Sequence, residues 1–174
     1  MTLYEQVLER EWKDLDARLQ FFHRETGRPW QGHARVQWTR NPLLRLALWL
    51  SPLPREAERV ALQFRFRDTP NCQYWERRFA DRPSVSTQFV RNGKLFESFG
   101  AATGMLTNKV LNGALAITCE RFQLWRIPVP GLLGLCARAH EWAEGRRIHF
   151  DVRMYLFNAL LLRYTGSLAE TDVA

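Results

Sequence analysis

The chain has 174 residues, of which 46% are hydrophobic and 13% aromatic, and this composition predicts a single globular domain over residues 1–174. Its formal net charge of +7 comes mainly from scattered arginines without a nucleic-acid-binding motif, so we expect no nucleic-acid partner. Three widely spaced cysteines exclude a disulfide framework, and no segment reaches the roughly 18 apolar residues of a membrane span, so we expect a cytoplasmic protein.

Two segments early in the chain have the features of helices. Thr2 and Glu5 form a capping-box pattern, and an apolar stripe at spacings of three and four follows, which predicts one helix over 3–25. The stripe consists of Tyr4, Leu8, Trp12, Leu15, Leu19 and Phe22. A second, short apolar helix is predicted over 42–50, because Asn41 and Pro42 supply a cap and a first-turn proline.

The remainder of the chain alternates apolar and polar residues between turn signals, which is typical of antiparallel strands. Asn92-Gly93, Asn112-Gly113 and Glu144-Gly145 each lie between two such runs and predict two-residue hairpin turns. Strands are expected near 33–39, 60–67, 73–79, 84–91, 94–99, 105–111, 114–125, 138–143, 146–155 and 160–168.

These elements predict an α+β fold: a curved, mainly antiparallel sheet or partial barrel of about 8–10 strands, with the N-terminal helix and the second short helix packed on it. The segment Ile127–Leu135 is apolar but contains two prolines and two glycines, so neither a strand nor a long helix is expected there. We interpret it as a mobile cover over a cavity, or as an interface.

Spaced motifs over nearly the whole chain resemble a bacterial family catalogued as domain of unknown function 4166. The resembling stretches are the Leu3-Tyr4 helix, Trp75-x-Arg77-x-Phe79, Ser86-x-Gln88, Glu97-x-Phe99-Gly100, Pro128-x-Pro130, Glu141-Trp142, Phe150-Asp151-Val152 and Tyr164-x-Gly166-x-Leu168. Members are sometimes fused to a dehydrogenase-like nucleotide-binding domain, which this sequence lacks. The resemblance implies no established chemistry.

The hairpin about Asn92-Gly93 pairs Val90 with Leu95, Gln88 with Glu97 and Ser86 with Phe99, all on one face. Arg77 shares its face with Trp75 and Phe79 and is placed to reach Glu97 across one intervening strand. Three interpretations of this face remain open: a solvated surface, a structural ion pair, and a ligand or catalytic site.

In the third hairpin, a turn at Glu144-Gly145 places His140 opposite His149 and Arg138 opposite Asp151. Two facing histidines would need further ligands to hold zinc, so we predict no metal site. Glu141 shares its face with apolar residues and is the better candidate for a functional carboxylate.

These observations favour a non-enzymatic binding module that holds an apolar or amphipathic small molecule in a sheet-lined cavity, without a cofactor. The predicted ligand-binding residues are Trp75, Arg77, Gln88, Glu97, Phe99, Glu141 and Tyr164. One alternative is an enzyme that uses Glu97 or Glu141 as general acid or base. Another is a protein-interaction domain that uses the apolar segments 43–50 and 127–135. The sequence leaves the ligand and the oligomeric state open.

Overall fold

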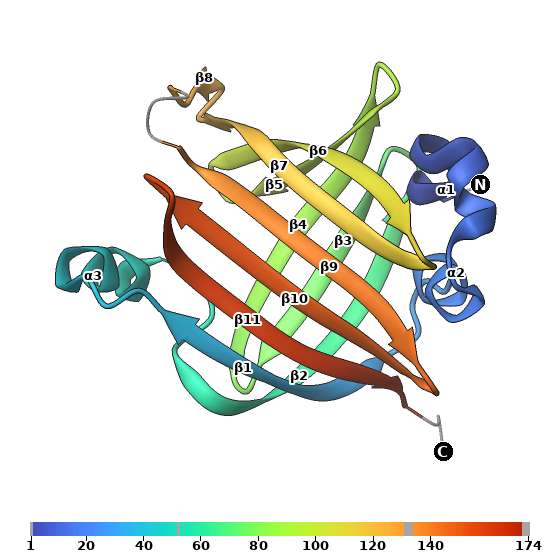
Figure 1. Cartoon of the computed structure of the whole chain (residues 1–174), viewed down its shortest axis with the longest axis horizontal. Coiled ribbons are helices and arrows are strands. Elements are labelled where there is room, and N and C mark those ends of the chain that lie inside the picture. Colours follow the sequence, from blue (N-terminus) through green and yellow to red (C-terminus); the bar gives the residue numbers. More distant parts are fainter. Residues whose placement is uncertain (1, 52, 131–133, 172–174) are drawn as a thin grey trace.

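The computed structural model describes residues 2–51, 53–130 and 134–171. In these residues ten strands form a closed antiparallel barrel, as Figure 1 shows. The barrel strands are β1 (Trp30–Trp38), β2 (Ala57–Thr69), β3 (Cys72–Phe79), β4 (Arg82–Arg91), β5 (Lys94–Phe99), β6 (Ala102–Leu111), β7 (Ala114–Leu124), β9 (Cys136–Glu144), β10 (Arg147–Leu156) and β11 (Ala159–Glu170). The predicted α+β class is confirmed, and the sheet closes fully.

The barrel strands follow one another around the ring in chain order. Each pairs with the next along the sequence, β7 pairs directly with β9, and β11 returns to pair with β1. The two-residue strand β8 (Ile127–Pro128) lies outside the ring and pairs only with the end of β7. The expectation that no strand forms in 127–135 is therefore wrong for these two residues, and 131–133 of that segment lie outside the described residues.

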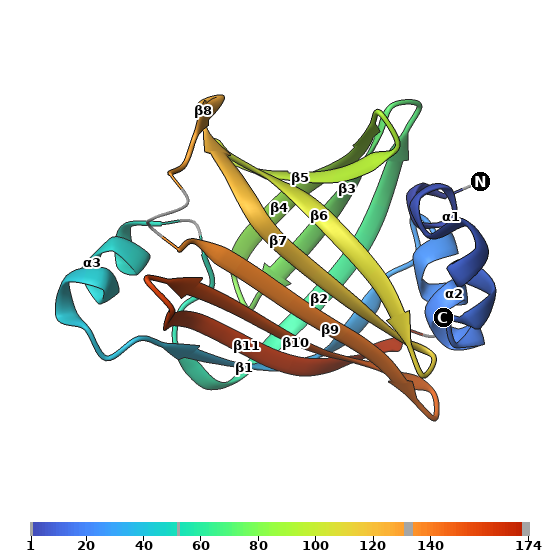
Figure 2. The same cartoon turned by 45° about the horizontal axis from the view of Figure 1, so that its top comes forward.

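Because the strands alternate in direction, their connections alternate between two ends of the barrel, which Figures 1 and 2 show on opposite sides. At the closed end, short turns at 70–71, 92–93, 112–113 and 145–146 lie beside the N-terminal helices. At the open end lie the described residues of the connections between the other strands, 39–51, 53–56, 80–81, 100–101, 125–130, 134–135 and 157–158. These two names are kept below.

The N-terminal segment covers the closed end as three short helices. They are α1 (Leu3–Leu8), the 3₁₀ helix η1 (Glu9–Asp14) and α2 (Ala17–Arg24), so the prediction of one helix over 3–25 is wrong. The α-helical path ends at Glu9, whose φ of 47° leaves the right-handed region, and Asp16 caps a new helix by accepting a hydrogen bond from the Arg18 backbone. The bends let the whole predicted apolar stripe face the barrel and become buried.

The second predicted helix forms as α3 (Pro42–Leu50), with the Asn41 side chain accepting hydrogen bonds from the backbone of Leu43 and Leu44. It lies at the open end, away from the N-terminal helices (Figure 1). Leu48 is its one buried residue among those described, while its other large apolar side chains are exposed or half-buried. Within the described residues, no helix is long and apolar enough to cross a membrane.

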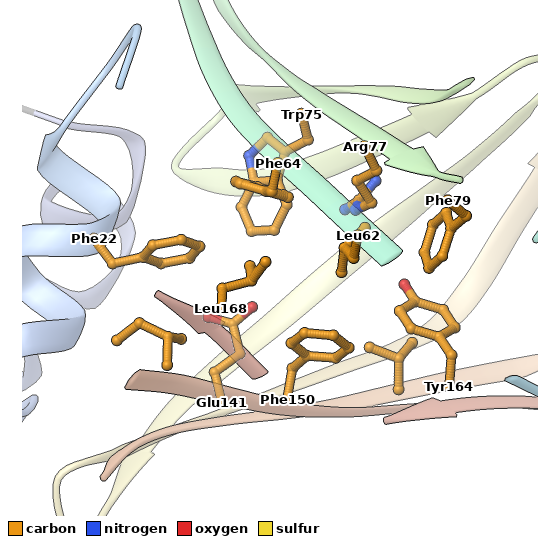
Figure 3. A pocket seen from close by; sticks show the side chains of 12 residues that line it. Phe22, Leu62, Phe64, Trp75, Arg77, Phe79, Glu141, Phe150, Tyr164 and Leu168 are labelled. Carbon is orange, nitrogen blue, oxygen red and sulfur yellow. The ribbon is translucent and has the colours of Figure 1, made fainter. Parts of the chain in front are cut away.

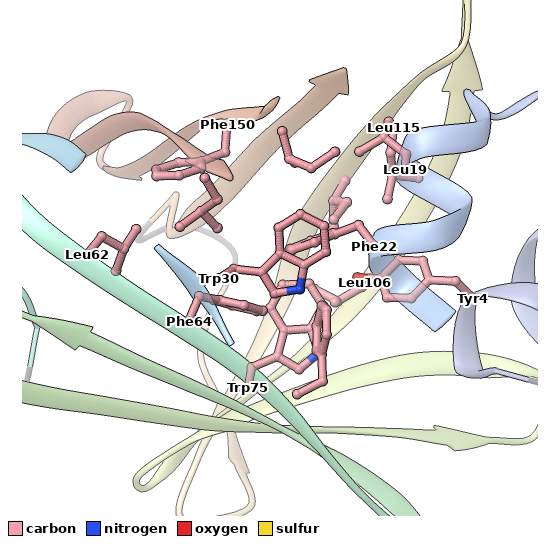
Figure 4. Close-up of a cluster of buried hydrophobic side chains, with 14 of the residues drawn as sticks. Tyr4, Leu19, Phe22, Trp30, Leu62, Phe64, Trp75, Leu106, Leu115 and Phe150 are labelled. Carbon is pink, nitrogen blue, oxygen red and sulfur yellow. The ribbon is translucent and has the colours of Figure 1, made fainter. Parts of the chain in front are cut away.

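An aromatic cluster fills the closed half of the barrel. Phe22 of α2 lies 4.9 Å from both Trp30 and Phe66, and Trp75 lies 5.0 Å from Phe66, measured between ring centroids. Figure 4 shows Phe22, Trp30 and Trp75 gathered between the helices and strands. Edge-to-face contacts of this kind stabilise by about 0.5–1.5 kcal/mol each beyond burial. The dense packing at this end leaves most of the free interior space to the other half.

Two of the three predicted hairpins have the expected register. Arg91 pairs with Lys94 around Asn92-Gly93, and Leu111 pairs with Ala114 around Asn112-Gly113, with positive φ at all four turn residues. The Val90–Leu95 and Gln88–Glu97 pairs form as predicted, but the ladder ends at Thr87–Ser98, so the predicted Ser86–Phe99 pair does not form.

The third hairpin has a different register from the one predicted. Its turn residues are Gly145 and Arg146, because Gly145 takes the first central position with a φ of 57°, and Glu144 consequently pairs with Arg147. His140 lies opposite Asp151, so the predicted pairs His140–His149 and Arg138–Asp151 are both wrong. The pairing is shifted by two residues, because the predicted partner of His140 was His149. A shift of two leaves each side chain on its predicted face, so Glu141 still shares an apolar face with Phe150.

Candidate functional site

The open half of the barrel contains a cavity of about 400 Å³. Its walls come mainly from apolar side chains on the inner faces of the strands, and residues of the open-end connections, Ser51, Leu53, Pro54, Gly100 and Ala101, lie at its mouth. A smaller extension of about 50 Å³ continues toward Phe22 and Phe150 (Figure 3). Volumes of roughly 300–1,000 Å³ are typical of small-molecule sites.

Small residues on the inner face leave this space unfilled. Ala137 and Ala139 line the cavity from β9, and Gly104 lines it from β6. A side-chain carbon at Gly104 would lie only 2.3 Å from the sulfur of Cys119, so the glycine lets β6 and β7 pack with Cys119 pointing inward. The cavity is thus a consequence of residue choice on three inward-facing positions.

All seven residues predicted from the sequence to bind a ligand line this cavity, although they come from β3, β4, β5, β9 and β11. They are Trp75, Arg77, Gln88, Glu97, Phe99, Glu141 and Tyr164. In Figure 3, the side chains of Arg77, Glu141 and Tyr164 point from opposite walls toward one interior space.

Three polar side chains form a connected cluster on one wall. The Arg77 guanidinium donates a hydrogen bond of 2.9 Å from Nη1 to the Ser86 hydroxyl, and Nη2 lies 3.4 Å from Glu97 Oε1. The Ser86 hydroxyl in turn donates a short hydrogen bond to the same Glu97 oxygen. The side chains of Arg77 and Glu97 are 13% and 27% exposed, so the pair is partly desolvated yet reachable from the cavity. Arg77 thus reaches Glu97 across β4, as the register predicted.

Two tyrosines and Gln88 extend the polar surface of the interior. Burial raises the pKa of the Tyr4 hydroxyl well above its usual value of 10.0, and the charges of Glu141 and Glu97 add to this effect. The Gln88 amide beside Tyr4, and Arg77, act in the opposite direction. Burial likewise raises the pKa of Tyr164, against an opposing effect of Arg77. Both hydroxyls therefore stay protonated at neutral pH and can donate hydrogen bonds.

A second buried polar pair joins the helices to the barrel. His23 of α2 is fully buried, and its Nε2 lies 2.9 Å from Glu141 Oε2, while its ring centroid lies 4.2 Å from that of Tyr4 with the two rings tilted by 35°. Sequence reasoning missed His23 and left Tyr4 as a core residue only. The spacing offered a signal, because His23 follows Leu19 by four residues and so shares the buried face of its helix.

The two histidines of the third hairpin, His140 and His149, lie on the outer face of β9 and β10 together with Asp151. His140 and His149 each stack on the Trp142 ring with centroids 5.3 Å apart. Asp151 hydrogen-bonds Arg153 and Arg163, and although burial raises the pKa of this carboxyl, the two arginines lower it below its usual value. The described residues contain no group of three or more metal-ligating side chains.

Comparison with known proteins identifies a family but no activity. No curated protein matches the sequence. A crystal structure of a protein of unknown function from the DUF3598 family of Nostoc punctiforme PCC 73102 is similar to this chain with 12% sequence identity and a TM-score of 0.49, covering 82% of this chain and 46% of that one. The chain thus spans less than half the length of that protein. The family model for the Domain of unknown function (DUF4166) matches residues 15–168, and the chain belongs to this family.

Proposed function

We propose that the protein binds an amphipathic small molecule inside the barrel, with the polar group of the ligand at the Arg77–Ser86–Glu97 cluster and its apolar part along the walls toward the mouth. The observation that carries this proposal is the combination of an apolar cavity of about 400 Å³ with that cluster on one wall. Ligand sites typically combine apolar walls with a few convergent polar groups.

The cluster suits a head group that both accepts and donates hydrogen bonds. Arg77 offers guanidinium donors, Glu97 and Glu141 offer carboxylate acceptors, and the protonated Tyr164 hydroxyl offers a further donor, all facing the cavity. Above them the lining is apolar, including Phe122 and Leu124 from β7 and Met154 from β10. A purely apolar molecule would leave the polar groups without ligand partners, so an amphipathic molecule fits better.

One observation supports the alternative of an enzyme. His23 holds Glu141, which lines the cavity, at hydrogen-bonding distance, and such a fixed carboxylate is suited to act as a general acid or base. The histidine itself is sealed in the core and has no access to a substrate. The binding function requires no such access, and for this reason we favour it.

Fluorescence titration with 11-(dansylamino)undecanoate tests the proposal, followed by displacement with dodecanoate, dodecylamine and dodecanol to define the preferred head group. We expect saturable binding to the wild-type protein. Ala139→Phe fills the cavity and should lower the affinity at least tenfold, whereas Ala116→Phe, on the outer face of the neighbouring strand β7, should not. Absence of saturable binding, or equal binding by both variants, would contradict a ligand site in the barrel.

The enzyme alternative has its own readout. Native mass spectrometry of freshly purified protein would show a co-purified molecule as a mass above that of the chain. A molecule that stays chemically unchanged on prolonged incubation supports binding alone. Conversion that stops in Glu141→Gln would instead assign the cavity a reaction, with Glu141 as its acid or base.

A further inference from the structure

Large exposed apolar side chains concentrate at the open end of the barrel. Of the eleven described residues of this kind, nine lie in or beside the open-end connections: Leu43, Leu46, Trp49, Leu50, Leu124, Trp125, Ile127, Phe157 and Leu160. They come from three connections that are far apart in the sequence but lie together at the open end of the barrel (Figure 2). We call these nine residues the rim. Grouped apolar surface of this kind marks an interaction site.

Helix α3 contributes four of the nine rim residues. Leu43, Leu46 and Leu50 follow helical spacing on one exposed side, Trp49 lies beside them, and Leu48 anchors the helix to the barrel. A helix with leucine and tryptophan exposed together is poorly explained by packing within this chain. It has the composition of helices that lie in the interfacial region of a lipid bilayer.

Arginines without acidic partners accompany the rim. Within the described residues, Arg40, Arg55, Arg82 and Arg126 form no ion pair, and the Nη1 atoms of Arg55 and Arg82 are buried without a hydrogen-bond acceptor. Burial and the nearby charge of Arg82 lower the pKa of Arg55. Among the described residues of all the open-end connections, the acidic side chains are Glu56 and Asp81. Glu56 already pairs with Arg45 at 2.6 Å. The mouth therefore carries an excess of positive charge.

We propose that the open end docks on the surface of an anionic phospholipid bilayer, with α3 and the rim in the interfacial region and the unpaired arginines against lipid phosphates. The apolar rim matches the acyl boundary, and each arginine near an anionic surface contributes about 1 kcal/mol. A second copy of the chain fits less well, because two open ends facing each other would bring like charges together. Docking places the cavity mouth against the lipid and goes beyond the proposed ligand binding.

Co-sedimentation of the full chain with vesicles tests this inference. We expect binding to vesicles of phosphatidylcholine with one quarter phosphatidylglycerol, weaker binding to pure phosphatidylcholine, and loss of binding as salt rises. Leu46→Glu should reduce vesicle binding at least tenfold. Leu111→Glu is the matched control, since Leu111 is 57% exposed like Leu46 but lies at the closed end, and it should bind as the wild type does.

The arginines have a control of their own. Arg55→Gln and Arg82→Gln should each weaken binding to the anionic vesicles about fivefold, which corresponds to about 1 kcal/mol, while Arg91→Gln at a closed-end hairpin should not. Equal vesicle binding by the Leu46→Glu and Leu111→Glu variants would overturn the inference. So would a dimer that buries the rim and does not bind vesicles. Binding of 11-(dansylamino)undecanoate without vesicles separates the two proposals, because Leu46→Glu, outside the cavity lining, should retain it and Ala139→Phe should not.

Discussion

Replacing Arg77 with methionine tests whether the polar cluster inside the barrel stabilises the fold. The variant keeps much of the side-chain volume but removes the hydrogen bond to Ser86 and the ion pair with Glu97. It also removes the guanidinium from its place 5.1 Å above the Trp75 ring. Glu97 then keeps only its bond from Ser86 in a partly desolvated site.

The expected loss follows from these contacts. A hydrogen bond to a charged group contributes about 1.5–3 kcal/mol, and breaking a fully buried ion pair costs about 3–5 kcal/mol. Glu97 remains 27% exposed, so water can partly solvate its carboxylate after the substitution. We therefore expect the free energy of unfolding to fall by about 2 kcal/mol, within the range for one hydrogen bond to a charged group. About 2 kcal/mol lowers the melting temperature of a chain of this size by about 4–8 °C.

Thermal unfolding followed by circular dichroism measures this change. The double variant Arg77→Met/Glu97→Gln should recover part of the lost stability, because it removes the orphaned carboxylate together with its partner. Arg65→Met is a matched control: Arg65 pairs with Glu76 at 2.8 Å on the outer face, with 52% of its side chain exposed, and should cost less than about 1 kcal/mol. Equal melting temperatures for Arg77→Met and the wild type would refute the reasoning.

Three further substitutions or titrations probe other parts of the interior. Gly166→Ala should destabilise the protein by about 3 kcal/mol in urea unfolding, because its new methyl would meet a backbone carbonyl oxygen of β1 at 2.2 Å; an unchanged midpoint would show that β1 and β11 can separate. Glu141→Ala should cost about 1–3 kcal/mol, since it leaves the buried His23 ring without its acceptor, and Glu141→Gln should cost less. Absorbance at about 295 nm should show Tyr4 and Tyr164 still protonated above pH 10, where unfolded tyrosines ionise. Their raised pKa values stabilise the fold fully below pH 10, and this stabilisation is lost as pH rises toward the folded-state values; complete ionisation near pH 10 in the native protein would contradict this.

The sequence predicts the antiparallel strands and much of their pairing, because alternation and turn chemistry are local properties. Asn92-Gly93 fixes both positive φ angles of its turn and hence the Gln88–Glu97 pair. Glu144-Gly145 lacks that second constraint, and the turn forms one residue further along, which is why the histidine pairing was wrong. Closure of the barrel could not be predicted, since the pairing of β1 with β11 depends on the accumulated twist and curvature of all ten strands.

The candidate site was predictable to the extent that strand alternation sorts side chains by face. Arg77, Glu97 and Glu141 were each grouped on one strand face with apolar neighbours, and all three line the cavity, but whether the face of Arg77 and Glu97 is buried was left open. His23 was not found, since its contact with Glu141 joins segments that only the folded chain brings together. The break at Glu9 also escaped prediction, because a continuous apolar stripe gives no indication of a bend imposed by the rounded barrel end.

The pairing of β1 with β11 affects how the barrel closes during folding. It joins residues 30–38 to 162–170, while the other barrel pairings join strands that are consecutive or separated only by the short β8 segment. Loop-closure entropy makes this seam roughly 3–4 kcal/mol costlier to bring together than a hairpin. We therefore expect the hairpins to assemble early and the seam to close last. Local opening at the same seam would admit water, or a ligand too bulky for the mouth, along the full length of the barrel.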